Sequence, residues 1–330
     1  MNRCISIIST AFLMSLLLSC AGGGNKKTKE DKRLETRSLP TVTLPSMIQD
    51  RQEAAEYMAM HYWDAFMQTG KAQEDGSGYR CDSLHVSGVP MGDFEQNLAN
   101  YIYILESLPL KTAQKAVARV ADMAQACETA DTSSNVFETF VKMAEKYLFD
   151  PNSPLRNEDL YSPFADKLSR STHLDEATRD RYAYVTEMCR LNEKGTKAAD
   201  FRFCDKSGRM HTLHGIKAER TLLFFSNPGC QSCLEIINML KAEPAVAQMI
   251  ADGRLAVLNI YIDEDLQGWK EYMSVYPEEW YNGFDPDLVI RTDKTYNVRA
   301  IPSLYLLDSD KTVLLKDATP EKVLSQTVGA

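Results

Sequence analysis

The stretch Thr221-Leu222-Leu223-Phe224-Phe225-Ser226-Asn227-Pro228-Gly229-Cys230-Gln231-Ser232-Cys233 decides the fold of the second half of the chain. Its first six residues form a short β-prone run, typical of a central strand buried on both faces. Asn-Pro-Gly is a turn signal. The apolar residues that follow, Ile236, Ile237 and Leu240, have helical spacing. The stretch therefore predicts a strand, a turn and a helix, with a Cys-x-x-Cys pair where the helix begins.

The position of Cys230 and Cys233 at the start of a helix indicates thiol chemistry. The first sulfur lies over the helix N-terminus, where unpaired N–H groups and the helix dipole favour a thiolate. Residues three apart on a helix share a face, so the two thiols can close a disulfide with little movement. The pair can therefore cycle: Cys230 attacks a disulfide, and Cys233 resolves the mixed intermediate.

Further segments around this motif predict an α/β domain over residues 198–330. A hairpin is expected where two β-prone runs flank Asp205-Lys206-Ser207-Gly208-Arg209. Strands are also expected at 255–262, 288–291, 303–307 and 312–316, and helices at 266–276 and 320–328. Strands that alternate with helices predict a central mixed sheet flanked by helices.

At these residues the sequence resembles thioredoxin-like proteins, and most closely the extracytoplasmic, membrane-tethered TlpA/ResA-like thiol-disulfide oxidoreductases. A second motif, Arg299-Ala300-Ile301-Pro302-Ser303, precedes a predicted strand. The resemblance implies that Pro302 is cis and lies against the active-site disulfide, and that the backbone of Ile301 pairs with a substrate polypeptide. It also implies that no organic cofactor or metal is needed, because electrons travel as a dithiol pair.

The sequence departs from this family at three positions. A buried Asp six residues before the first cysteine is replaced by Phe224, and a Glu three residues after the second is replaced by Ile236. The Trp common before the first cysteine is replaced by Gly229. We therefore expect another proton acceptor for the second thiol. The candidates are Asp263 and Glu264, at the end of the neighbouring strand, and Glu235, the nearest acid.

Residues 46–195 have helical periodicity throughout. Apolar residues recur at 3.6-residue spacing over segments such as 113–127 and 136–148. Two more helices are expected at 156–170 and 175–194. This pattern predicts an all-helical domain, which resembles an uncharacterised helical family found in lipoproteins of this kind. It contains no catalytic constellation, and the sequence does not indicate its role.

Residues 1–19 have the pattern of an export signal. Arg3 precedes an apolar run from Ile5 to Leu18, which is shorter than the roughly 20 residues of a spanning helix. The ending Leu17-Leu18-Ser19-Cys20 resembles a bacterial lipobox, which implies that Cys20 is lipidated and anchors the protein in the bilayer. A plain signal peptide is the alternative.

Residues 20–45, rich in Gly and Lys, predict a flexible tether between the lipid and the helical domain. In many lipoproteins of this class, an Asp after the lipidated cysteine retains the protein at the inner membrane. Ala21 stands there instead. We therefore expect a protein that faces the periplasm, with the outer membrane favoured.

Composition narrows the classes of function. A content of 44% hydrophobic and 25% charged residues is ordinary for a globular protein. The net charge of −9 opposes nucleic-acid binding, which needs a basic surface. The expected partners are exported proteins that carry disulfides or thiols, and a membrane electron donor if the protein is a reductase.

Three alternatives to a reductase remain open at this stage. The dipeptide between the cysteines leaves the direction undecided among reduction, oxidation and isomerisation. The protein can also be a binding or assembly lipoprotein, with a functional helical domain and a redox-inactive scaffold. Finally, His211 and His214 together with Cys230 and Cys233 resemble a zinc-ligand set.

Pairing among the remaining cysteines is not readable from the sequence. They are Cys81, Cys127, Cys189 and Cys204.

Overall fold

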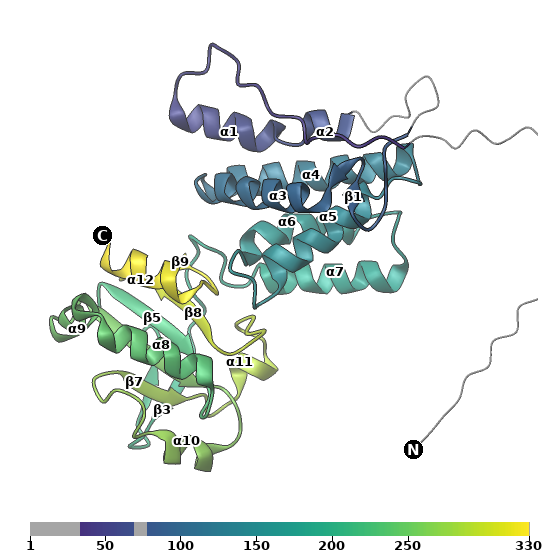
Figure 1. The fold of residues 1–330 in the computed structure, drawn as a ribbon. Helices are drawn as coiled ribbons and strands as arrows, with labels where there is room; N and C mark the ends of the chain where they lie inside the picture. Colours follow the sequence, from purple (N-terminus) through teal and green to yellow (C-terminus); the bar gives the residue numbers. More distant parts are fainter. Residues whose placement is uncertain (1–33, 69–77, 330) are drawn as a thin grey trace, which may run out of the picture.

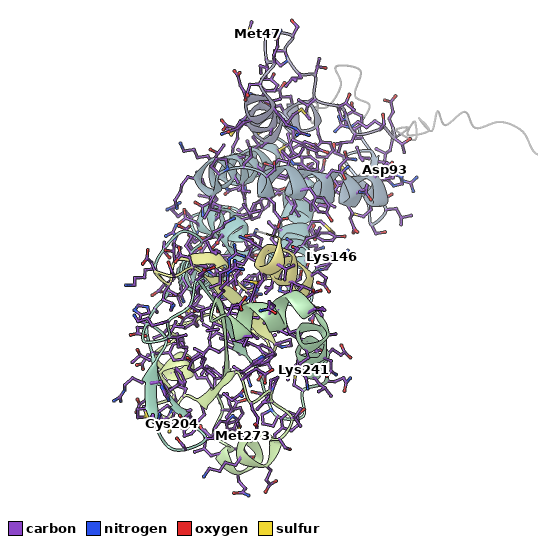
Figure 2. The ribbon with its side chains drawn as sticks, turned by 90° about the vertical axis from the view of Figure 1, so that its left-hand side faces the viewer. Met47, Asp93, Lys146, Cys204, Lys241 and Met273 are labelled. Carbon is purple, nitrogen blue, oxygen red and sulfur yellow. A yellow bond between two sulfur atoms is a disulfide. The ribbon has the colours of Figure 1, made fainter. Side chains whose placement is uncertain are left out.

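The computed structural model describes residues 34–68 and 78–329, so the predicted leader and Cys20 lie outside the described residues. Figure 1 shows two bodies, a group of helices formed by the first half of the chain and a sheet with its own helices formed by the second half. Met47 and Met273 lie at opposite ends of the molecule (Figure 2). Within the described ranges, no helix combines the length and apolar composition needed to cross a bilayer.

The first body is a helical bundle with one small hairpin, β1–β2, that the helical pattern did not predict. Its core is aromatic: the ring of Trp63 packs against those of Phe94 and Phe140, with centroids 5.2 and 5.0 Å away. Its elements are α1 (Arg51–His61), α2 (Asp64–Gln68), β1 (His85–Val86), β2 (Val89–Pro90), α3 (Met91–Glu106), α4 (Leu110–Ala130), α5 (Val136–Ala144), the π-helical turn η1 (Glu145–Phe149), α6 (Glu158–Leu168) and α7 (Glu176–Cys189).

The segment 34–45, predicted as part of a flexible tether, is instead attached to the helical bundle. The Arg37 guanidinium donates to the carbonyl of Ser87 at 2.8 Å and to that of Phe66 at 3.1 Å. Leu39 packs against the apolar core of the bundle. Composition alone indicated a solvated linker, but specific hydrogen bonds between distant residues hold this part of the chain in place.

The second body is built on a seven-stranded sheet with the order β4-β3-β7-β6-β5-β8-β9. β5, β6 and β7 are parallel, and the other neighbouring pairs are antiparallel, so the sheet is mixed as predicted. Its elements are β3 (Arg202–Asp205), β4 (Met210–Thr212), β5 (Arg220–Phe225), α8 (Gln231–Ala242), α9 (Pro244–Ala251), β6 (Leu255–Tyr261), α10 (Leu266–Tyr272), β7 (Tyr281–Phe284), α11 (Val289–Thr292), β8 (Ser303–Leu307), β9 (Val313–Leu315) and α12 (Pro320–Val328).

The central strand β5 is buried on both faces, as its continuous apolar run predicted. Leu222 and Phe224 face a cluster formed with helices α8, α9, α10 and α12. Leu223 and Phe225 face a second cluster on the other side of the sheet, which α11 and the segments before β3 and after β4 cover. The Cys-x-x-Cys turn follows the C-terminal end of β5, and Cys233 packs on the face of the sheet that Leu222 and Phe224 cover.

The strand predicted at 288–291 is wrong, because this segment is helix α11 and the sheet takes 281–284 as β7 instead. Asp285 begins the turn between them: its carboxylate accepts hydrogen bonds from the backbone N–H of Asp287 and of Ile290, at 3.2 and 2.9 Å. Leu288 adopts a left-handed φ of 54°. A run of three apolar residues, Leu288 to Ile290, does not distinguish a strand from a helix, and the hydrogen bonds of the Asp285 side chain decide the outcome.

Gly283 in β7 is expected to tolerate no side chain. A Cβ there would lie 2.6 Å from Cδ2 of Phe203 and 3.0 Å from the carbonyl oxygen of Cys204 on β3. Gly283→Ala should therefore lower the free energy of unfolding by about 1–3 kcal/mol, as overpacking does. Urea unfolding measures this. Gly92→Ala is the control, because a Cβ at that helical position meets nothing within 4 Å; equal losses in both variants would contradict the expectation.

The two bodies are joined by backbone pairing as well as by the chain. The linker runs beside β9: Gly195 donates to the carbonyl of Val313 at 2.8 Å, and Val313 donates to that of Thr196 at 2.9 Å. In Figure 1, β9 and α12 lie at the side of the sheet nearest the helical bundle. The linker therefore covers an edge strand and holds this side of the sheet against the bundle.

Candidate active site

Cys230 and Cys233 form a disulfide at the N-terminus of α8, just beyond the end of β5. Their Cα atoms are 5.2 Å apart. Cys230 is the N-cap of α8, and its sulfur accepts a hydrogen bond from the backbone N–H of Cys233 at 3.2 Å. This N–H is one of the unpaired donors of the first helical turn, and it favours a thiolate on Cys230 once the disulfide opens.

The two sulfurs differ in their access to solvent. Cys233 is only 2% exposed and lies in the apolar cluster with Phe224, Ile236 and Leu240. Cys230 is partly exposed and packs at the edge of this cluster. Only Cys230 is therefore placed to meet a partner molecule first.

Gly229 opens the approach to Cys230. Its φ of +72° is a backbone conformation that glycine adopts without strain. A Cβ at Gly229 would meet nothing within 4 Å. With no side chain at position 229, the chain leaves this side of Cys230 uncovered.

The segment Ile301–Pro302 lies beside this turn, and its peptide bond is cis, as the resemblance implied. Phe225 at the end of β5 pairs with Ser303 at the start of β8. Because the two strands are antiparallel, Pro302 lies level with Ser226, at the entrance to the turn that carries the cysteines. Ile301 packs against the same apolar cluster as Cys230. The structure thus brings the two sequence motifs together.

Of the three acids predicted as proton acceptors, Asp263 is the one connected to the cysteine turn. Its Oδ2 accepts from Nδ2 of Asn227 at 2.8 Å, and the carbonyl of Asn227 accepts from the N–H of Cys230 at 3.2 Å. Its Oδ1 forms an ion pair with Arg291 at 2.6 Å. Glu264 is exposed at the end of β6.

Glu235 lies on the solvent side of α8, where it accepts from Gln231 at 3.1 Å. It lies two positions after Cys233, which turns its side chain about 200° away around the helix. Phe224 and Ile236, the two positions at which the resemblance led us to expect an acid, are buried in the apolar cluster.

The sequence did not predict a buried row of three polar side chains, Ser226, Asn259 and Asn282, which lies on the face of the sheet that Phe224 covers. The Ser226 hydroxyl donates to Oδ1 of Asn259, and Nδ2 of Asn259 donates to Oδ1 of Asn282 at 3.1 Å. All three residues are buried. A signal was present, because Asn259 interrupts an otherwise apolar strand, and a buried polar residue in such a run needs partners.

Among the described residues, Cys81, Cys127, Cys189 and Cys204 are free thiols. Burial raises the pKa of Cys127, Cys189 and Cys204, which makes these thiols poor nucleophiles at neutral pH. Cys204 lies at the end of the molecule away from the helical bundle (Figure 2). Among the described cysteines, only Cys230 and Cys233 form a disulfide, and this disulfide lies at the N-terminus of a helix.

The predicted alternative of a zinc site finds no support in the geometry. Nε2 of His211 pairs with Asp205 at 2.8 Å, and the ring of His214 contacts the carbonyl of Ala198 at 2.8 Å. Across residues 34–68 and 78–329, no three His, Cys, Asp or Glu side chains converge as metal ligands.

Comparison with known protein families identifies both halves of the chain. Residues 219–313 match the model of a thioredoxin-like family, Thioredoxin_8. Residues 19–73 and 88–192 match a domain of unknown function, DUF5106. Among curated proteins, none matches the chain.

Solved structures include similar proteins. A thioredoxin-like protein from Bacteroides caccae is 35% identical, with a TM-score of 0.71, over 88% of this chain and 98% of its own. The C-terminal domain of an uncharacterised protein from Bacteroides fragilis is 48% identical over 42% of this chain and 99% of its own, with a TM-score of 0.41. The thioredoxin domain of a thiol-disulfide oxidoreductase from Bacteroides vulgatus is 17% identical over 41% and 97%, with a TM-score of 0.35.

The B. caccae protein shares both bodies with this chain, since the match spans almost the whole of each. Together with the mixed sheet, the Cys-x-x-Cys turn at a helix N-terminus and the cis-proline beside it, this relationship shows that the chain belongs to the thioredoxin-like family, with an additional N-terminal helical domain of the DUF5106 type.

Proposed function

We propose that this protein is a lipid-anchored periplasmic thiol-disulfide oxidoreductase that reduces or isomerises disulfides in exported proteins. The observation that carries the proposal is the asymmetry of the sulfur pair. A partly exposed Cys230 at the N-terminus of α8 is bonded to Cys233, which is 2% exposed. A disulfide that closes such a short loop constrains the unfolded chain little, so it would add little to the free energy of unfolding. A purely structural role therefore explains the pair poorly.

The reaction balances as two exchanges between the reduced pair and a client disulfide. The Cys230 thiolate attacks one client sulfur, and the other client sulfur leaves with the bonding electrons as a thiolate. The Cys233 thiolate then attacks the Cys230 sulfur, which restores the Cys230–Cys233 disulfide and releases the client as a dithiol. A reductase needs a membrane dithiol donor to reduce the pair again, and an isomerase returns the client disulfide in a new pairing.

Further parts of the proposal concern the location of the protein, its substrate and its proton acceptor. The lipobox-like Leu17–Cys20 supports a lipid anchor, and Ala21 supports an outer-membrane destination. The Ile301 backbone beside the disulfide supports an extended client segment as the substrate. Asp263, linked to the turn through Asn227, is our candidate for the group that accepts the Cys233 proton.

Trapping tests the proposal directly. Cys233→Ala removes the resolving thiol, so the mixed disulfide on Cys230 should accumulate with a disulfide-bearing polypeptide such as insulin. Non-reducing gel electrophoresis and mass spectrometry detect the adduct, which dithiothreitol should release. The double variant Cys230→Ser/Cys233→Ala is the control and should form none. If Cys233→Ala formed no adduct, the redox-inactive scaffold would be favoured.

The reduction potential of the pair separates the directions of the reaction. Equilibration with a glutathione or dithiothreitol series should give a value near or below about −250 mV for a reductase. A value of about −120 to −180 mV would instead indicate an oxidant or isomerase. A pair that does not cycle would contradict both.

A further inference from the structure

Six charged side chains are buried where the helical domain meets the thioredoxin-like domain. Three are cations and three are carboxylates, so their charges balance. Their side chains are between 1% and 12% exposed. They are Arg156, Glu158 and Asp159 of the helical domain, and Arg299, Lys316 and Asp317 of the thioredoxin-like domain.

Arg299 is the member of this cluster nearest to the cis-proline, two residues before Ile301. Its Nε donates to Oε1 of Glu158, and the same carboxylate oxygen accepts from Nδ2 of Asn297 at 2.7 Å. Its Nη1 donates to the carbonyl of Phe149, whose ring lies 4.3 Å from the guanidinium. The helical domain therefore binds the side chains of two residues, Asn297 and Arg299, that precede Ile301 in the chain.

Asp317 binds the residue that follows the segment Ala300–Pro302, which is here called the cis-proline loop. Its Oδ1 accepts from the hydroxyl of Ser303 at 2.8 Å, and its Oδ2 accepts from Nη2 of Arg299 at 3.2 Å. Arg156 of the helical domain donates to the backbone carbonyls of Asp317 and Ala318 at 2.9 and 3.0 Å. The residues on both sides of Ala300–Pro302 are thus tied to one buried cluster.

We propose that Glu158 is a positioning residue of the helical domain: through Arg299 it holds the Ala300–Pro302 segment in the place where an extended substrate polypeptide pairs. This rests on the proposed function and gives the helical domain a part in it. Only three residues separate Arg299 from Ser303, and both are anchored by side-chain hydrogen bonds, so loosening Arg299 allows the peptide groups of Ile301 to shift. Backbone pairing with a substrate depends on such positions to within about 1 Å.

The proposal predicts different effects on two substrates. A polypeptide such as insulin uses both the backbone beside Pro302 and the sulfur of Cys230. The small disulfide 5,5′-dithiobis(2-nitrobenzoate) uses the sulfur alone. In the full chain, with dithiothreitol as the reductant, Glu158→Gln should raise KM for insulin about tenfold. It should leave kcat for insulin, kcat/KM for the small disulfide and the reduction potential unchanged within about twofold.

A matched control lies at the same domain interface. Glu106 of α3 binds Lys322 of α12 at 2.6 Å and the Asn157 side chain at 3.5 Å, and these contacts do not involve Arg299 or the cis-proline loop. Glu106→Gln should therefore leave the insulin KM unchanged. The double variant Glu158→Gln/Arg299→Gln should raise it no further than Arg299→Gln alone, because both changes remove one contact.

Several outcomes overturn the proposal. An unchanged insulin KM in Glu158→Gln does so, and so does an equal rise in Glu106→Gln, which would indicate a general effect of the interface. Circular dichroism would show whether Glu158→Gln fails to fold. In that case Ser303→Ala is the second variant, because it removes the hydrogen bond to Asp317 and keeps all six charges. It should raise the insulin KM and leave kcat/KM for the small disulfide unchanged, and an unchanged insulin KM would contradict the proposal. If the wild-type protein reduced neither substrate, the proposed function itself would fail.

Discussion

Replacing Cys230 with serine is expected to lower the rate of insulin disulfide reduction by about 10³-fold or more, because the hydroxyl is not ionised at neutral pH and does not exchange with disulfides. The structure supports an effect of this size, since Cys233 is 2% exposed and has no direct access to a client. Turbidity of the precipitating insulin chain, with dithiothreitol as the reductant, measures the rate.

Cys81→Ser is the matched control for this experiment. Cys81 is a partly exposed free thiol in the helical domain. Cys81→Ser therefore makes the same replacement of sulfur by oxygen at a position away from the disulfide. We expect the control to keep the wild-type rate within about twofold. A Cys230→Ser variant as active as the wild type would contradict the proposed function, and a control as inactive as Cys230→Ser would show that thiol loss acts through the fold.

Replacing Lys316 with methionine is expected to lower the free energy of unfolding by about 3–5 kcal/mol, the cost of removing one partner from a buried ion pair. The Lys316 ammonium is 2% exposed and lies 3.1 Å from Oε2 of Glu158 and 3.6 Å from Oδ1 of Asp159. Burial opposes its charge, but the two carboxylates outweigh this and raise the pKa of Lys316. Methionine fills a similar volume, but it leaves the buried Asp159 carboxylate without its cation and leaves Glu158 paired with Arg299 alone.

Lys322→Met tests whether burial is the cause. This lysine also pairs with a carboxylate across the domain interface, but the side chains of Lys322 and Glu106 are 36% and 20% exposed. Its removal should cost about 1 kcal/mol or less. Urea unfolding followed by circular dichroism measures both variants, and a Lys316→Met protein within about 1 kcal/mol of the wild type would contradict the expectation.

Much of the thioredoxin-like half was readable from local patterns. The apolar run of β5, the Asn-Pro-Gly turn and the helical spacing after Cys230 each act over a few residues, so they predict their own structure. The segment 288–291 shows the limit of this approach. Its apolar residues fit a strand, but the carboxylate of Asp285 caps a turn that starts helix α11.

By itself, the sequence determined the fold class, the Cys-x-x-Cys pair at the start of a helix, and the cis-proline motif, because each depends on residues close together in the chain. Only the tertiary structure decided the link between the two domains. Glu158 and Arg299 are 141 positions apart, and each alone reads as an ordinary surface charge. Burial makes each of these charges depend on the other, because a charge withdrawn from water is unfavourable without a partner of opposite charge. The fold supplies that partner from the other domain.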